Sequence, residues 1–318
     1  MMTSQIDESV YQAAQTTAVL VDRSALATFT ITGAARLELL DRISTNRVKT
    51  LRSGQGAATV LTTDIGRIID RLLLYADDAT VTMLAGAEHR DPLARYLLRN
   101  VFFNDDFQLQ DVTETTAVLA IYGPQAAQLL AGAGFPATDL PLHHWRQATI
   151  ADVPAALHKT DPIAGDGYFV ICPADAKDAL WAHLQANGIT LADEAAFDYL
   201  RIAEGLPRFG RELALDYIPL ETGLWADVSF NKGCYTGQEI IARMESRGKL
   251  AKRLARLRLD SPAAVGAEIK AEGKTVGNIT SVGVGPQGVV ALGYVKTAVL
   301  DEGKALYVGG GTAVPLPT

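Results

Sequence analysis

The sequence reads KGCYTGQE from Lys232 to Glu239 and continues as the apolar run IIARME. Thr236 and Glu239 stand three residues apart in front of this run, which is the spacing of a capping box. A helix is therefore predicted to begin at Gly237. Because Cys234 precedes this start, we expect it in a glycine-flanked turn ahead of the positive end of the helix.

Cys234 has two interpretations from its neighbours alone. Lys232 and Arg243 flank it in the sequence, and together with the helix end they favour the thiolate, as in reactive cysteines. A free cysteine is just as often a small buried hydrophobic residue. The local sequence leaves both interpretations open.

The octet from Lys232 to Glu239 resembles the signature of the YgfZ family at all eight positions. These folate-binding proteins are related to the glycine cleavage T-protein, an aminomethyltransferase, and are associated with iron–sulfur protein maturation and tRNA modification. Weaker matches to the family occur in the expected order: LLDRISTNRV at 39–48, SGQGAATVLTTDIGRIIDRLLLY at 53–75, LRIAEGLPRFG at 200–210 and YIPLE at 217–221.

The resemblance implies an α+β, T-protein-like folate-binding fold. Two interleaved mixed α/β domains would surround a central channel in residues 1–251, and a C-terminal antiparallel β-barrel would occupy residues 252–318. The residue pattern supports this division independently. Helical and strand patterns mix up to about Ile241, whereas turn signals recur every eight to twelve residues from Ala263 onward, as in a small barrel or sandwich.

Asp70 lies in a predicted strand with isoleucine and leucine on both sides. Such a carboxylate is either an acid–base group with a raised pKa or a structural ion pair, with Arg67 or Arg71 as the candidate partner. Strand alternation allows a third arrangement, in which Asp70 lies on an exposed face. In T-proteins the matching acid is taken to assist one-carbon transfer, so the resemblance implies a catalytic and folate-binding role for Asp70.

The resemblance also assigns the remaining site residues. The arginine that matches Arg201 holds the glutamyl carboxylates of folate in relatives, a task that suits a bidentate guanidinium. Without the resemblance, Arg201 is equally a helix-end arginine that snorkels. Cys234 would be the reactive or metal-facing thiol, and its octet neighbours Lys232 and Tyr235 would contact the cofactor, tetrahydrofolate or a one-carbon-substituted form. No resident metal is expected, because a cluster needs about four thiolate ligands.

One position departs from the T-protein pattern. T-proteins have a glutamate directly after an aromatic residue, and this glutamate holds the pterin ring. In this sequence Tyr168 is followed by Phe169. The departure counts against true aminomethyltransferase activity.

Composition limits the class of protein. A chain of 318 residues with 48% hydrophobic residues can bury a large core, and a net charge of −7 argues against a general nucleic-acid binder. The basic run 249–258 could still attract a polyglutamate tail or tRNA phosphates, or could be a solvated strand face. Two distant cysteines, Cys172 and Cys234, and a polar N-terminal segment without a targeting pattern predict a cytoplasmic protein.

Three functions follow from these observations. The first is a tetrahydrofolate-binding protein of the YgfZ type, which supports iron–sulfur cluster assembly or repair and iron–sulfur-dependent tRNA modification. Its partners would be iron–sulfur proteins or tRNA-modifying enzymes. The alternative is a folate-dependent aminomethyltransferase, and the third is an RNA-associated module that uses the basic run.

Overall fold

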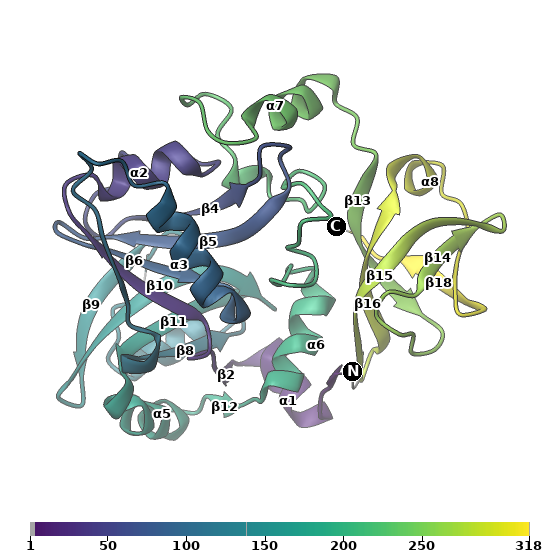
Figure 1. Cartoon of the computed structure of the whole chain (residues 1–318). Helices are drawn as coiled ribbons and strands as arrows, with labels where there is room; N and C mark the ends of the chain where they lie inside the picture. Colours follow the sequence, from purple (N-terminus) through teal and green to yellow (C-terminus); the bar gives the residue numbers. More distant parts are fainter. Residues whose placement is uncertain (1–3, 138, 318) are drawn as a thin grey trace.

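The computed structural model describes residues 4–137 and 139–317, and the chain passes between two sheets before it forms a barrel. After β1 (Ser4–Gln5) and α1 (Glu8–Thr16), β2 (Val19–Asp22) joins a six-stranded sheet. The chain then builds a complete five-stranded sheet and returns to the first sheet with β8 (Thr116–Tyr122). This crossing confirms the predicted interleaving of two mixed domains (Figure 1).

The two sheets have five and six strands. The five-stranded sheet has the order β4 (Gly56–Thr62), β5 (Ile68–Ala76), β6 (Val81–Ala85), β3 (Ala27–Thr32) and β7 (Gln108–Asp111). The six-stranded sheet has the order β12 (Thr190–Leu191), β2, β8, β11 (Asp166–Pro173), β10 (Val153–Ile163) and β9 (Trp145–Ile150). β4 and β5 form an antiparallel hairpin, in which Leu61 pairs with Asp70.

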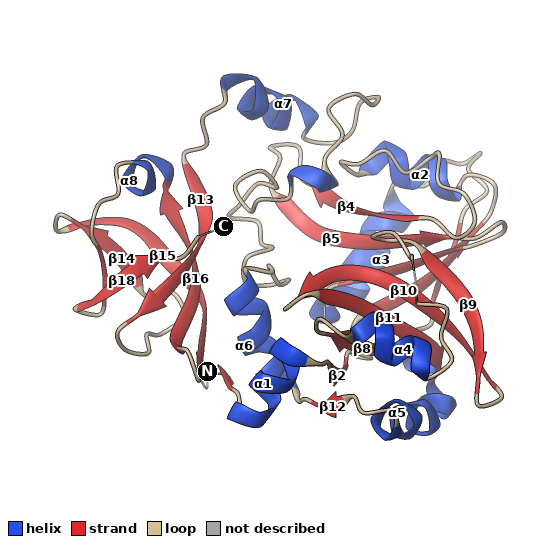
Figure 2. Cartoon of the chain, turned by 180° about the vertical axis from the view of Figure 1, so that it is seen from behind, coloured by secondary structure: helices blue, strands red, loops and turns tan. Residues whose placement is uncertain are grey.

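Four helices cover the outer faces of the two sheets. The apolar sides of α2 (Arg36–Ile43) and α3 (Arg90–Arg99) pack on the five-stranded sheet, and those of α4 (Ala126–Gly132) and α5 (Lys177–Ala186) pack on the six-stranded sheet. By contrast, α6 (Glu194–Glu204) lies between the sheets and the barrel, as both views show (Figures 1 and 2). Phe197 and Tyr199 of α6 join a core that also contains Tyr75 and Phe169 from the two sheets.

The C-terminal strands close into an antiparallel barrel. Their order is β15 (Lys274–Gly285), β14 (Glu268–Ala271), β17 (Leu306–Val308), β18 (Gly311–Pro315), β13 (Lys252–Leu259) and β16 (Gly288–Lys296), which pairs back with β15. A short α8 (Thr297–Asp301) follows β16. The N-terminal β1 pairs in parallel with β15. The barrel sheet therefore includes a strand from the start of the chain, which the predicted boundary at residue 251 does not include.

The helix after the octet differs in one detail from its prediction. α7 (Gln238–Arg247) has Gly237 as its N-cap, and no side chain caps it, so the predicted capping box is wrong. The reason is the backbone of Gly237, which has a φ of 83°. A Cβ atom there would lie 2.4 Å from the carbonyl oxygen of Thr63, so close packing on the β4–β5 turn requires glycine.

Candidate functional site

A cavity of about 140 Å³ lies between the inner faces of the two sheets and α6. Its walls are mainly aromatic and charged. The five-stranded sheet contributes Asp70 and Arg71, and the loop after α6 contributes Arg208 and Phe209. The six-stranded sheet and α6 contribute Tyr122, Asp161, Phe169, Phe197 and Arg201. This cavity is where the predicted central channel lies.

Asp70 is fully buried on the cavity wall, and it is held by hydrogen bonds instead of an arginine. Its carboxylate accepts the backbone N–H groups of Arg71 (2.7 Å) and Gly86 (3.2 Å) and lies 3.0 Å from Nδ1 of His89. Burial raises the pKa of Asp70, and the contact with His89 offsets part of that rise. The exposed arrangement and the pairing with Arg67 or the Arg71 guanidinium are therefore wrong, and the acid–base role of Asp70 stays a prediction.

The guanidinium of Arg71 joins three separate segments of the chain. It donates from Nε to Asp227 at 2.6 Å and pairs with both carboxylate oxygens of Asp161 at 2.6 and 3.0 Å. Burial alone would raise the pKa of Asp161, but Arg71 outweighs it and the pKa is lowered. The sequence does not single out Asp161, Asp227 or His89. Each is an isolated polar residue in the sequence, and its partner lies far away in the chain.

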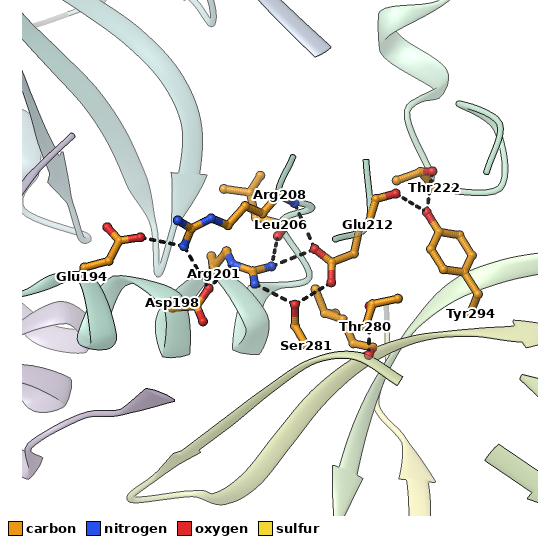
Figure 3. Close-up of polar contacts among 11 residues, drawn as sticks. Glu194, Asp198, Arg201, Leu206, Arg208, Glu212, Thr222, Thr280, Ser281 and Tyr294 are labelled. Atoms are coloured by element: carbon orange, nitrogen blue, oxygen red, sulfur yellow. Dashed lines mark hydrogen bonds and ion pairs between the residues drawn. The ribbon is translucent and has the colours of Figure 1, made fainter. Parts of the chain in front are cut away.

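Arg201 is buried in a network of polar contacts at the junction of α6 and the barrel (Figure 3). Its Nε donates to Asp198 at 2.6 Å, and its other N–H groups bind Glu212 (2.9 Å), the carbonyl of Leu206 (3.2 Å) and Ser281 of β15 (2.7 Å). Its side chain is only 1% exposed, so the snorkelling arrangement is wrong. The folate-holding role of Arg201 stays a prediction, although four of its five N–H donors already have partners.

Lys232 and Tyr235 support the octet loop and are not among the residues that line the cavity. The Lys232 ammonium is buried, and it donates to the backbone carbonyls of Ser44 (2.9 Å) and Asn46 (2.7 Å) after α2. Tyr235 packs against Leu220, and burial raises the pKa of its hydroxyl to about 12. In this structure both residues anchor the loop, and their contact with the cofactor stays a prediction.

Cys234 is exposed and lies outside the cavity lining. The interpretation as a buried hydrophobic residue is therefore wrong for Cys234, and it holds for Cys172, whose pKa burial raises to about 11. The Lys232 ammonium, which was expected to favour the thiolate, donates hydrogen bonds to backbone carbonyls. Among the described residues, no group of three or more histidine, cysteine or acidic side chains is arranged to hold a metal.

The residue that departs from the T-protein pattern lies on the cavity wall. Phe169 of β11 is 5% exposed and faces the core between the sheets. The carboxylate of Asp161, on the neighbouring strand β10, lines the same cavity. The position of the missing glutamate is therefore apolar, but a carboxylate is still present on this wall.

The basic run is divided between two faces of β13. Lys252 donates to the carbonyl of Asp216 at 3.1 Å and Arg256 to that of Ala203 at 2.7 Å, so both face the first part of the chain. Arg253 is on the other face and pairs with Asp301 of α8 at 2.9 Å. Arg253 therefore does not share a face with Lys252 and Arg256, and binding of RNA by the basic run stays a prediction.

Two interleaved sheets around a cavity, with a barrel docked through α6, define an α+β protein with a cavity between its domains. Residues 3–232 match the family model described as GCVT N-terminal domain, and residues 252–317 match the CAF17 C-terminal beta-barrel domain. The chain therefore belongs to the GCVT family. This pair of domains confirms the family resemblance drawn from the octet.

Relatives with similar sequences cover most of the chain. It is 29% identical to At1g60990 of Arabidopsis thaliana, a chloroplastic protein named as a transferase, over 95% of this chain and 71% of that protein. It is 30% identical to the aminomethyltransferase of Thermus thermophilus, over 92% of this chain and 83% of that enzyme. The crystal structure of the glycine cleavage system aminomethyltransferase T from Bartonella henselae, at 24% identity, covers 98% of this chain and 88% of its own with a TM-score of 0.84, which confirms the fold.

In the part of the chain that the structure describes, no helix has the length and apolar character needed to span a bilayer.

Proposed function

We propose that this protein binds tetrahydrofolate, or a one-carbon-substituted form of it, in the cavity between the two sheets. The observation that carries the proposal is Asp70, a buried carboxyl group whose pKa is raised by burial and which lies on the wall of that cavity. Aromatic walls suit a flat heterocyclic ring. Asp70 and Asp161 are hydrogen-bond acceptors for its N–H groups, and membership of the GCVT family supports a folate ligand.

We infer further that the protein acts in the YgfZ manner, in iron–sulfur cluster assembly or repair and in iron–sulfur-dependent tRNA modification. The exposed position of Cys234 supports this, because a thiol outside the cavity is accessible to a partner protein. A single thiol contact would be transient, since clusters are held by about four ligands. A cytoplasmic location, where thiols stay reduced, is part of this proposal.

The second candidate is a folate-dependent aminomethyltransferase. The contact between Asp70 and His89 favours it, because a carboxyl group on the cavity wall with an imidazole nitrogen 3.0 Å away can hold and transfer a proton. Phe169 counts against it, since the wall offers no carboxylate at that position. Release of ammonia from an aminomethyl donor in the presence of tetrahydrofolate would distinguish this candidate from the first.

Calorimetric titration with 5-formyltetrahydrofolate tests the folate site. We expect micromolar binding by the unmodified protein and at least about 10-fold weaker binding by Asp70→Asn, which removes a charge-assisted acceptor but keeps the shape of the side chain. Asp260→Asn, at an exposed carboxylate of the barrel, is the matched control. If the unmodified protein shows no binding of folate, the proposed site is wrong.

The role of Cys234 needs a separate test in cells that lack the protein. We expect Cys234→Ser to restore less iron–sulfur enzyme activity than the unmodified chain at equal protein level. Cys172→Ser, at a buried cysteine, is the control for general effects of thiol removal. Full restoration by Cys234→Ser would remove the thiol from the proposal and leave the folate site unaffected.

A further inference from the structure

The cavity opens to the surface between two arginines. Arg23 follows β2 and Arg208 lies in the loop after α6, and both line the cavity. Both also line a wider groove of about 1200 Å³, which runs along the start of α6 and the start of α1. A ligand that extends out of the cavity into the groove therefore passes between Arg23 and Arg208.

Glu194, the first residue of α6, bridges these two arginines. One carboxylate oxygen lies 2.6 Å from the Arg23 guanidinium, and the other lies 2.6 Å from that of Arg208. Arg208 also lies 3.4 Å from Asp198, and Figure 3 shows its contacts to both acids. Two guanidinium groups in this arrangement each pair with one oxygen of a single carboxylate, and such charge-assisted contacts are stronger than those between neutral groups.

The two arginines are held more firmly than the acid between them. Arg23 is 12% exposed, and its guanidinium lies 3.9 Å from the centre of the Phe197 ring. Arg208 is 29% exposed, whereas Glu194 is 50% exposed. Ion pairs of exposed side chains contribute only about 0–1 kcal/mol, so Glu194 can be exchanged for another carboxylate at little cost.

Arg201 cannot exchange its acidic partners for a ligand carboxylate in this way. Its partner Glu212 is fully buried and its partner Asp198 nearly so, and removing either acid from the guanidinium would leave a buried charge uncompensated. The cations that can receive a ligand carboxylate at this end of the cavity are therefore Arg23 and Arg208.

The groove beyond the arginine pair carries negative charge. Asp7, Glu88 and Asp193 line it, together with Asp22, which pairs with Lys177 at 2.7 Å. A chain of several carboxylates would meet these acids once it passed the two arginines. The groove thus suits a ligand whose anionic part ends at the mouth of the cavity.

We propose that Arg23 and Arg208 form a subsite for the terminal glutamyl group of a short-tailed folate, and that Glu194 competes with this group from within the chain. The identity of the ligand rests on the proposed function, whereas the subsite itself rests on the geometry of the three side chains. Two consequences follow. Removal of the Glu194 charge strengthens binding, and additional glutamates on the ligand do not.

Calorimetry with Glu194→Gln and Arg208→Gln tests the subsite, with Arg253→Gln on the barrel as the control for loss of a partly exposed arginine. The probes are 5-formyltetrahydrofolate, its triglutamate form, the tail fragment p-aminobenzoylglutamate, and 6-methyltetrahydropterin, which has no tail. For 5-formyltetrahydrofolate we expect about 3-fold tighter binding by Glu194→Gln and about 10-fold weaker binding by Arg208→Gln. Binding of the tail-less pterin should stay unchanged in both variants, and the triglutamate should bind the unmodified protein no tighter than the monoglutamate.

The outcomes separate the subsite from the proposed function. The subsite is wrong if folate binding is the same in both variants as in the unmodified protein, or if the triglutamate binds much more tightly than the monoglutamate. Either result leaves the proposed folate site unaffected. Binding of p-aminobenzoylglutamate that depends on Arg208, without binding of the pterin, supports the subsite and overturns the folate assignment. Absence of binding by every probe overturns both.

Discussion

Replacement of Arg201 by methionine is expected to destabilise the protein strongly. The substitution keeps an unbranched side chain of similar length but removes the only cation within hydrogen-bond distance of Glu212 among the described contacts. Glu212 is fully buried, and it would keep only the N–H of Arg208 and the hydroxyl of Ser281 as donors. Removing one partner from a buried ion pair typically costs about 3–5 kcal/mol. That is a large part of the 5–15 kcal/mol by which domains are commonly stable.

Urea denaturation followed by tryptophan fluorescence and by circular dichroism measures this loss. All three tryptophans, Trp145, Trp181 and Trp225, precede the barrel, so fluorescence reports the two sheets and circular dichroism reports the whole chain. Because Arg201 also binds Ser281 of the barrel, we expect the two transitions to separate in Arg201→Met.

The double variant Arg201→Met/Glu212→Gln is the matched control. A glutamine at position 212 keeps an acceptor for Arg208 and Ser281 and carries no charge, and Asp198 keeps its contact with Arg208 at 3.4 Å, so most of the lost stability should return. A loss below about 1 kcal/mol in Arg201→Met, or a double variant less stable than the single one, would refute the reasoning. A stable Arg201→Met that has lost only folate binding would instead favour the role implied by the family resemblance.

Three further predictions concern protonation, backbone and thiols. Burial lowers the pKa of His158 to about 3, so the unfolded chain takes up a proton below about pH 6.5 that the folded protein excludes. The free energy of unfolding should therefore fall as the pH drops from 6.5 towards 3, by up to about 1.4 kcal/mol per pH unit. In urea titrations at several pH values, His158→Phe should reduce this slope. An unchanged slope would contradict the conclusion that His158 is buried in its neutral form. Gly237→Ala should lower the free energy of unfolding by about 1–3 kcal/mol, because Gly237 has a positive φ and contacts Thr63. Gly248→Ala, also at positive φ but in open space, should lower it by less. Equal losses in the two variants would contradict the packing argument. A thiol reagent should label Cys234 in the folded protein and Cys172 only after denaturation, and two thiols labelled under native conditions would be the contrary result.

Much of the fold was predictable because it depends on local pattern. The helix predicted after the octet is α7, and the strand predicted to carry Asp70 is β5. Periodic burial within a segment and turn residues between segments carry this information in the sequence itself. The capping box failed because contact with the distant β4–β5 turn, and not the local spacing, sets the conformation of Gly237.

The sequence by itself determined which residue types the site contains, the mixed α+β character of the first part of the chain and the all-β character of the last. Only the tertiary structure decided which of these side chains contact one another. Asp70 binds His89 and not an arginine, Arg201 is buried between acids, and Cys234 and Lys232 lie outside the cavity lining. The physical reason is that burial and charge pairing arise between segments tens to hundreds of residues apart. A side chain's neighbours in the sequence therefore do not reveal whether its charge is free for a ligand or already compensated.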